Sequence, residues 1–376
     1  MIMSDHSVAF AKCGSYDVNL HESIARVVDL LGGIGSFISR DQSVLIKPNM
    51  LSDRKPESAV TTHPQVVRAL IRMTRDFGAR PFVADGPANA TKVEKVWETT
   101  GFRALCNEEN VPLVNLSESG SSRVEIDGYV FNISNAVLNA DAIINVPKIK
   151  THVLTMFTAA VKNMYGIIPG FMKTTLHKRY PTPHEFGGLL HALYKAVPPT
   201  LSVADGVIGM DGDGPSGGSP VRLGFVAAAH DSADLDIAVC RILGINPMSV
   251  DYLARITAVG AHSEEMIQYL GDPITELRPA SFKIPNVSMA SFVPNWLARI
   301  VAPFIWFRPA ISDKCIGCGQ CVKVCPANAL KLSDGKALLD STKCIGCCCC
   351  HEVCPEKAIT MRMSPLLNLV RKGRLP

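Results

Sequence analysis

Two matched cysteine runs, DKCIGCGQCVKVCP at residues 313–326 and TKCIGCCCCHEVCP at residues 342–355, set the organisation of this 376-residue chain. They lie within residues 313–360, a stretch that contains ten of the thirteen cysteines. Each run reads C-x2-C-x2-C-x3-C-P, the spacing in which three thiolates hold one 4Fe-4S cluster and the fourth thiolate binds the other cluster. Two copies of the run therefore predict a pair of clusters that share their ligand segments.

This spacing assigns each cysteine to a cluster. The first cluster is predicted to bind Cys315, Cys318, Cys321 and Cys354, and the second is predicted to bind Cys344, Cys347, Cys350 and Cys325. Cys348 and Cys349 are left over. We interpret these two as small hydrophobic residues, and a role as alternative ligands is the other interpretation.

Two other uses of these cysteines fit the sequence less well. Paired C-x2-C units also suit a tetrahedral zinc site, but zinc does not need four thiolates in this spacing, twice, each followed by proline. Disulfides are disfavoured because cysteines this close in a helical turn point away from one another. The runs instead resemble two-cluster bacterial ferredoxins over roughly residues 311–362, and this resemblance implies electron transfer at low potential between neighbouring clusters.

Composition limits the classes of protein to consider. Hydrophobic residues make up 47% of the chain and charged residues 19%, as in a well-packed globular protein. A net charge of +4 over this length gives little support for nucleic-acid binding. The first residues lack a basic segment followed by an apolar one, so we expect no signal peptide and a cytoplasmic location.

The most apolar window, residues 290–307, contains Pro294, Arg299 and Pro303 and falls short of the roughly 20 apolar residues that a membrane span needs. We therefore favour a buried linker helix over a membrane anchor. The alternative, association with a membrane surface, rests on two tryptophans and on a basic tail, namely Trp296, Trp306, Arg371, Lys372 and Arg374.

Short apolar runs alternate with helical periodicity over the first 150 residues, which predicts a layered α/β fold with a mostly parallel sheet and flanking helices. We expect an α/β domain at residues 1–285, an apolar linker helix at 286–310, a small α+β ferredoxin-like domain with two clusters at 311–362, and a basic tail at 363–376.

Polar residues follow several predicted strands at the point where each strand ends. The run at residues 44–46 ends at Lys47 and Asn49, and the run at residues 142–146 leads into Lys148. Ligands of open α/β sheets bind outside the carboxyl ends of the strands, so we expect an active site there. An ordinary solvated face is the alternative. The predicted catalytic residues are His152 as proton donor with Lys148, Lys150 and Lys162, and the predicted substrate-binding residues are Lys47, Asn49, Asn163, Asp205 and Asp211.

A glycine-rich stretch, VIGMDGDGPSGG at residues 207–218, follows another predicted strand. Its backbone amides suit an anion, and Asp211 and Asp213 suit a hard cation or proton transfer. The stretch matches neither the nucleotide P-loop nor the dinucleotide fingerprint, and a glycine-rich hinge or turn is an equal interpretation.

Several of these motifs together resemble the domain-of-unknown-function family 362. They are VLIKPN at residues 44–49, ADGP at 84–87, NVPKIKTH at 145–152, KNMYG at 162–166 and DGVIGMDGDGP at 205–215. The likeness covers roughly residues 8–245, and members of the family often carry this ferredoxin module at the carboxyl end. The resemblance implies an iron–sulfur protein with an α/β domain.

We expect an oxidoreductase in which two 4Fe-4S clusters pass electrons to an anionic small molecule at the strand ends, where lysines neutralise its charge. The alternative is a non-catalytic electron carrier or assembly partner that docks another redox protein. In both cases a redox protein is the expected electron donor or acceptor. An enzyme needs a closed pocket that contains the lysines, whereas a docking module would spread them over a flat surface.

Overall fold

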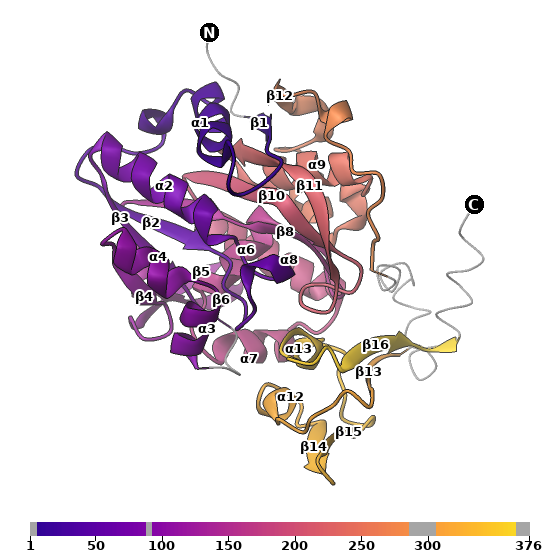
Figure 1. The fold of residues 1–376 in the computed structure, drawn as a ribbon. Coiled ribbons are helices and arrows are strands. Elements are labelled where there is room, and N and C mark those ends of the chain that lie inside the picture. Colours follow the sequence, from indigo (N-terminus) through magenta and orange to yellow (C-terminus); the bar gives the residue numbers. More distant parts are fainter. Residues whose placement is uncertain (1–5, 88–91, 286–305, 366–376) are drawn as a thin grey trace.

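The computed structural model describes residues 6–87, 92–285 and 306–365 (Figure 1). The predicted linker helix falls almost wholly outside these residues, as does most of the predicted basic tail. Among the described helices, none is both long and apolar enough to cross a membrane.

A ten-stranded sheet forms the centre of the α/β domain, with strand order β12-β1-β11-β10-β7-β2-β3-β4 and with β8 and β9 joined at the side of β10. Parallel pairs join β4, β3, β2, β7 and β10 in turn. The antiparallel pairs of β11 with β10 and with β1 carry the sheet to its other edge. The mostly parallel α/β fold predicted from the sequence is confirmed.

The strands of this domain follow the apolar runs of the sequence. They are β1 (Ser7–Lys12), β2 (Ser43–Pro48), β3 (Arg80–Asp85), β4 (Leu113–Asn115), β5 (Ser121–Ile126), β6 (Tyr129–Ser134), β7 (Ala142–Val146), β8 (Lys148–His152), β9 (Met156–Thr158), β10 (Leu201–Asp211), β11 (Ser219–Ala229) and β12 (Gln268–Gly271). Two of them differ from expectation. The segment after Pro147 continues as β8, and β10 extends into the glycine-rich stretch, so that only residues 212–218 of that stretch form a loop.

Helices cover both faces of the sheet. They are α1 (Leu20–Leu30), α2 (Pro64–Phe77), α3 (Val93–Thr99), α4 (Phe102–Glu108), α5 (Asn135–Leu138), α6 (Ala160–Asn163), α7 (Met172–Arg179), α8 (Pro183–Ala196), α9 (Ser232–Leu243) and α10 (Asp251–Ala258). Alternate residues of β2 separate the two cores: Leu45 packs with α6, α8, α9 and α10, whereas Val44 and Ile46 pack with α1, α2 and α4. This two-sided burial explains why the three successive residues Val44, Leu45 and Ile46 of β2 are all apolar.

Local sequence explains where several elements begin and end. Pro64 occupies the first turn of α2, where its missing N–H costs nothing, and Gly78 ends that helix in a left-handed conformation. A tight turn at Asp127-Gly128 joins β5 to β6, and both turn residues have positive φ angles of 50° and 77°. Gly101, with φ 80°, separates α3 from α4.

The ferredoxin module (residues 306–363) comprises β13 (Phe307–Ile311), α12 (Gln320–Lys323), β14 (Leu330–Ser333), β15 (Lys336–Leu339), α13 (Cys349–Glu352) and β16 (Ile359–Met363). β13 pairs with β16 and β14 with β15, both antiparallel. The predicted domain start at residue 311 therefore falls at the end of β13, which belongs to the module. α13 is the element that lies against the α/β domain, whereas β14 and β15 lie at the far end (Figure 1).

Hydrogen bonds to backbone carbonyls join the module to the α/β domain. Arg54 Nη2 donates to the carbonyl of Cys354 at 2.8 Å, and Lys357 Nζ donates to the carbonyl of Gly218 at 2.8 Å. The imidazole of His351 lies 2.9 Å from the carbonyl oxygen of Asp213 and 2.7 Å from that of Ile359. The loop at residues 212–218 thus serves as a contact surface for the module.

Candidate functional site

The cysteines of the module line two separate cavities. One, the first cysteine cavity, is lined by Cys315, Cys318, Cys321 and Cys354. The other, the second cysteine cavity, is lined by Cys325, Cys344, Cys347 and Cys350 together with Cys348 and Cys349. Each cavity therefore brings together one of the ligand sets that the spacing predicts, including the cysteine that comes from the other run.

Backbone amides point at the cysteine sulfurs. Ala329 N donates to Cys325 Sγ and Ala358 N donates to Cys354 Sγ, each at 3.2 Å, and Ala337 N donates to Cys315 Sγ at 3.4 Å. The two shorter bonds occupy matching positions in the two halves of the module. Hydrogen bonds to cluster sulfurs are one of the means by which a protein sets the reduction potential, so these donors fit an iron–sulfur cofactor.

Sulfur spacing separates an iron–sulfur site from a zinc site. A single zinc ion with Zn–S bonds of about 2.3 Å holds its sulfurs within roughly 4 Å of one another. Within residues 6–87, 92–285 and 306–365, the one group of three or more His, Cys, Asp or Glu whose ligand atoms all lie within 4.8 Å is His6, Asp234 and His262. No three thiols of these described residues therefore lie as close together as the sulfurs around one zinc ion do.

The two additional cysteines differ in position. Cys348 is fully buried with φ 65°, and its thiol donates to the carbonyl of Gly346 at 3.4 Å. Cys349 lines both the second cysteine cavity and a further cavity between the module and the α/β domain. Burial raises the pKa of the Cys348 thiol well above its ordinary value.

This further cavity, here called the interdomain cavity, encloses about 100 Å³. The module contributes Val324, Cys349, Glu352 and Val353 to its wall. The α/β domain contributes residues from the ends of β2 and β3 and from α6 to α7, namely Asn49, Leu51, Asp85, Gly86, Lys162, Asn163, Tyr165, Gly166, Lys173, Thr174 and His177. The cavity therefore lies at the carboxyl ends of parallel strands, where ligands of such sheets bind.

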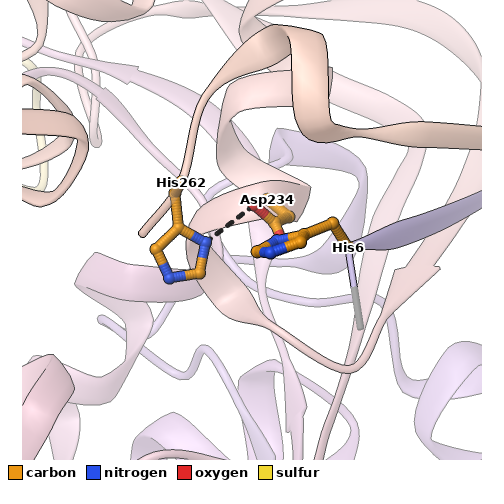
Figure 2. A group of neighbouring side chains, drawn as sticks. All are labelled: His6, Asp234 and His262. Carbon is orange, nitrogen blue, oxygen red and sulfur yellow. Dashed lines mark hydrogen bonds and ion pairs between the residues drawn. The ribbon is translucent and has the colours of Figure 1, made fainter. Parts of the chain in front are cut away.

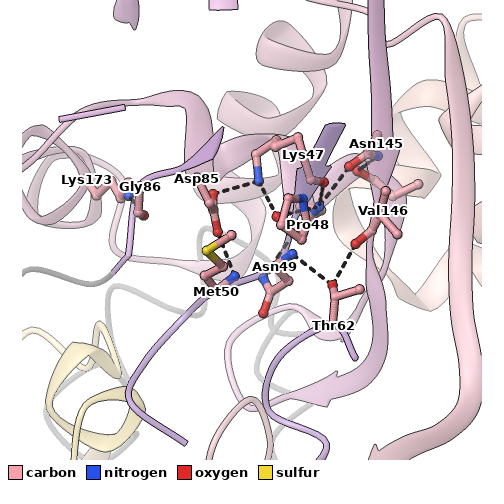
Figure 3. A network of polar contacts seen from close by, with 12 residues as sticks. Lys47, Pro48, Asn49, Met50, Thr62, Asp85, Gly86, Asn145, Val146 and Lys173 are labelled. Atoms are coloured by element: carbon pink, nitrogen blue, oxygen red, sulfur yellow. Dashed lines mark hydrogen bonds and ion pairs between the residues drawn. The ribbon is translucent and has the colours of Figure 1, made fainter. Parts of the chain in front are cut away.

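A buried ion pair forms the floor on the sheet side (Figure 3). Lys47 Nζ lies 2.9 Å from Asp85 Oδ1, and the backbone amide of Met50 donates to Asp85 Oδ2 at 2.7 Å. Gly166 is required here because a Cβ atom at this position would lie 2.7 Å from Lys47 Nζ and 2.5 Å from Asp85 Oδ1. Lys47 is thus a structural partner of Asp85, and only Asp85 of the pair lines the cavity.

Two lysines bring positive charge to the cavity. Lys162 has no hydrogen bond or ion pair with any described residue, and its ammonium lies 6.0 Å from the ring of Tyr165. Burial lowers the pKa of Lys162, and the negative charge of Glu352 opposes this shift. Lys173 Nζ donates to the carbonyl of Gly86 (Figure 3), and burial lowers its pKa to about 8.

A histidine and a carboxylate add groups that can exchange protons. His177 stacks on Phe186 with ring centroids 4.4 Å apart, and its Nδ1 has no hydrogen-bond partner among the described residues. Burial lowers the pKa of His177 to about 4, so its ring is neutral at pH 7. Glu352 comes from the module; burial raises its pKa, but His152 and the charge of Lys162 outweigh this effect and the net shift is downward.

Amide side chains connect the ends of β2 and β7 with α6 beside the cavity. Asn49 Nδ2 donates to Asn163 Oδ1 at 3.1 Å, and Asn163 Nδ2 donates to Asn145 Oδ1 at 2.8 Å. Lys150 Nζ donates to Asn49 Oδ1 at 2.9 Å and to the carbonyl of Val60 at 2.7 Å. Burial lowers the pKa of Lys150 to about 7, and nearby Lys162 adds to this shift.

The nine predicted α/β site residues do not all meet in one place. Lys162, Asn49 and Asn163 line the interdomain cavity, whereas Lys47, Lys148, Lys150, His152, Asp205 and Asp211 do not. The expectation that Lys47, Lys148, Lys150, His152 and Lys162 all face one cavity is therefore wrong.

Three of the residues outside the cavity have internal partners. Lys148 Nζ lies 2.8 Å from Asp205 Oδ2 and 2.8 Å from Tyr16 Oη. Asp211 Oδ2 accepts a hydrogen bond from the backbone amide of Lys283 at 3.1 Å. These contacts place Lys148, Asp205 and Asp211 in the framework of the sheet.

Lys173, His177 and Glu352 line the cavity although the sequence did not predict them as site residues. Lys173 and His177 lie four residues apart on α7, so helical spacing places them on one face of that helix. The spacing of Lys173 and His177 could therefore have indicated that they belong to one site. Nothing in the sequence indicated Glu352, because its position depends on how the module packs against the domain.

Comparisons with known proteins agree with this architecture. The family model "domain of unknown function (DUF362)" matches residues 44–241, and the 4Fe-4S binding domain model matches residues 310–331. A thylakoid-associated protein of Synechocystis, sll1697, is 32% identical over 290 residues, which cover 75% of this chain and 89% of that protein. Ferredoxin-2 of Desulfomicrobium norvegicum is 63% identical over 27 residues, which cover 7% of this chain and 46% of the ferredoxin.

A solved structure with a related outline is the lactate racemase apoprotein of Thermoanaerobacterium thermosaccharolyticum. Its TM-score is 0.42 and its sequence identity 14%, over 65% of this chain and 59% of that one. The family match extends over more than half of the chain, and the cysteine runs fall in and beyond the 4Fe-4S match. The chain therefore belongs to the DUF362 family and carries an iron–sulfur binding domain at its carboxyl-terminal end.

Proposed function

We propose that this protein is an iron–sulfur oxidoreductase that passes electrons through two 4Fe-4S clusters to an anionic small molecule bound in the interdomain cavity. The position of Cys349, whose side chain lines both this cavity and the second cysteine cavity, carries the proposal. A bound molecule would be separated from the second cluster by little more than that side chain. The clusters supply transfer of single electrons.

The charges around the cavity support an anionic substrate. A buried ammonium group without a partner is costly, and Lys162 has no ion pair or hydrogen bond with the described residues. A bound anion would supply the missing partner. Lys173 adds a second positive charge, and the Asn163 and Asn49 amides, fixed by their hydrogen bonds, would orient the substrate.

Reduction of most small molecules requires protons as well as electrons. His177 is neutral at pH 7 and lines the cavity, so its ring can exchange a proton with a bound substrate. Glu352 offers a proton acceptor on the opposite, module side. His152, predicted as the proton donor, is fully buried outside the cavity and would act only through Glu352, which lies 3.2 Å away.

The other candidate function was a non-catalytic electron carrier with lysines spread over a flat docking surface. Lys47, Lys148 and Lys150 are instead 2% exposed or less and bind internal partners. Lys162 lines the interdomain cavity. These placements favour an enzyme.

Anion binding to the anaerobically purified, oxidised protein tests the proposal. Inorganic phosphate, sulfite and acetate serve as calorimetric probes, and acid-released small molecules from the purified protein are identified by mass spectrometry. We expect at least one anion to bind, and Lys162→Met to weaken its affinity by about tenfold or more, as loss of a charged hydrogen bond does. Lys195→Met, which removes an exposed lysine paired with Asp127, is the matched control and should bind normally. Equal affinity in K162M and wild type, or no anion at all, contradicts the proposal.

A further inference from the structure

Two histidines meet one buried carboxylate at the end of the α/β domain far from the module (Figures 1 and 2). His6 directly precedes β1, Asp234 lies in the first turn of α9, and His262 follows α10. His6 Nδ1 lies 2.8 Å from Asp234 Oδ2, and His262 Nδ1 lies 2.8 Å from Asp234 Oδ1. The Asp234 side chain is 1% exposed, whereas those of His6 and His262 are 23% and 12% exposed, so solvent reaches the histidines.

Tyr194 determines the tautomer of His262. The Tyr194 hydroxyl lies 2.5 Å from Asp231 Oδ2, to which it donates its one proton, and 3.1 Å from His262 Nε2. Nε2 must therefore carry the hydrogen of the second contact. In the neutral ring, Nδ1 then presents a lone pair to Asp234 Oδ1. Two lone pairs at this distance repel each other unless a cation lies between them.

The negative charge around His6, Asp234 and His262 also favours a bound cation. Among the described residues, no lysine or arginine forms an ion pair with Asp231 or Asp234. Asp231 is stabilised by its position as N-cap of α9, where it accepts hydrogen bonds from the amides of Ala233 and Asp234. The Asp234 carboxylate contacts the imidazoles of His6 and His262. A buried carboxylate requires a compensating positive charge, which either protons on the histidines or a metal ion can provide.

We propose that His6, Asp234 and His262 bind a divalent transition-metal ion through His6 Nδ1, His262 Nδ1 and the carboxylate of Asp234. These three ligand atoms lie within 4.8 Å of one another, and two imidazoles with one carboxylate are a ligand set that zinc and ferrous iron accept. Tyr194 and Asp231 supply the outer hydrogen bonds that orient a metal-binding histidine. The ion would clamp the start of β1 to α9 and to the segment after α10, and water would complete its coordination.

Zinc serves as the probe on the full-length protein loaded with its iron–sulfur clusters. One equivalent is added anaerobically, excess is removed, and metal analysis is combined with zinc X-ray absorption spectroscopy. We expect one zinc per chain with nitrogen and oxygen neighbours at about 2.0–2.1 Å and no sulfur at about 2.3 Å. Protons compete for the same nitrogens, so zinc affinity should fall as the pH is lowered from 7 to 5.

Substitutions of the proposed ligands test whether the zinc ion binds at this site. His262→Ala and His6→Ala should each weaken zinc binding at least tenfold. Tyr194→Phe removes a hydrogen bond that positions His262; it should weaken zinc binding by about tenfold but leave nitrogen and oxygen as the neighbours of the zinc. His21→Ala removes an exposed histidine elsewhere and should bind zinc normally. The iron content reports whether each variant is folded. If H262A fails to fold, the zinc affinity of H6A and the zinc X-ray absorption spectrum of the wild-type protein still test the site. Sulfur neighbours at the zinc, unchanged affinity in H6A or H262A, or a wild-type protein without bound zinc each overturn the site.

Discussion

His152 Nε2 of the α/β domain lies 3.2 Å from Glu352 Oε1 of the ferredoxin module, within the distance of an ion pair. Neither atom makes a hydrogen bond of normal geometry with a described residue. Burial lowers the pKa of His152 to about 3, so the ring is neutral at pH 7 and leaves the charge of Glu352 largely uncompensated on this side. Glu352 and Lys162, which line the same cavity as Cys349, are therefore two charges placed to act on the second cluster.

Replacing these two charges should shift the reduction potential of that cluster in opposite directions. Glu352→Gln removes a negative charge and should raise the potential, whereas Lys162→Met removes a positive charge and should lower it. Shifts on the order of tens of millivolts follow from Coulomb interactions screened by the protein. Redox titration followed by electron paramagnetic resonance measures both, with the first cluster as internal control. Shifts of the same sign, or none, would show that the two charges do not act on the cluster directly.

The number of clusters is open to direct analysis. Anaerobically purified protein should be brown and contain about eight iron atoms and eight acid-labile sulfides, as two 4Fe-4S clusters require. Cys354→Ala should remove the cluster whose other three ligands lie in the first run, because Cys354 lines the first cysteine cavity. Loss of the cluster bound by the nearby Cys344, Cys347 and Cys350 instead would reverse the ligand assignment. Stoichiometric zinc without sulfide would exclude the clusters altogether.

Cys348 and Cys349 are expected to be dispensable for iron binding even though they line the second cysteine cavity. Four other thiols already line it, which is the number that one cluster needs. The double variant C348A/C349A should keep its iron content and nearly unchanged spectra of the reduced protein. Loss of half the iron would identify one of the two as a ligand, and C347A, which removes a predicted ligand, provides the comparison.

Strand geometry explains why the sequence predicted this site only in part. Lys47 and the run from Lys148 to His152 were expected to share a cavity because both begin where a predicted strand ends, yet Lys47 is paired with Asp85. Lys148, Lys150 and His152 belong to β8, in which alternate residues share a face but spread over ~13 Å. Side chains spaced in this way reach three different partners.

Cysteine spacing, in contrast, was sufficient to group the predicted ligands by cavity, because the thiols are held in short loops whose length fixes their separation. Glu352 could not be predicted as a residue of the interdomain cavity. Its position depends on the packing of α13 against the α/β domain, which involves single contacts such as that of Arg54 with the carbonyl of Cys354. Contacts of this kind leave no periodic pattern in the sequence.

His177 should make the stability of the protein depend on pH. Burial lowers its pKa from 6.5 to about 4, so between these values the unfolded chain binds a proton that the folded protein does not. Stability therefore falls as the pH is lowered from 6.5 to 4, by about 3 kcal/mol for this group. His177→Phe keeps the stacking on Phe186 and removes the titration, so its urea midpoint should depend less on pH than that of wild type. An equal slope in H177F and wild type would contradict the prediction.

Breaking the Lys47–Asp85 pair should strongly destabilise the protein, because both side chains are almost completely buried at 0% and 4% exposure. Lys47→Met leaves the Asp85 carboxylate without its counter-charge, which costs about 3–5 kcal/mol in such settings. Lys195→Met breaks a pair with Asp127 in which both side chains are more than 40% exposed, and it should cost less than about 1 kcal/mol. Denaturant unfolding of both variants measures the difference. The double variant K47M/D85N removes the isolated charge and should recover part of the loss. If K47M were no less stable than K195M, Lys47 would not be the buried partner of Asp85, and the floor of the interdomain cavity would have to be built differently.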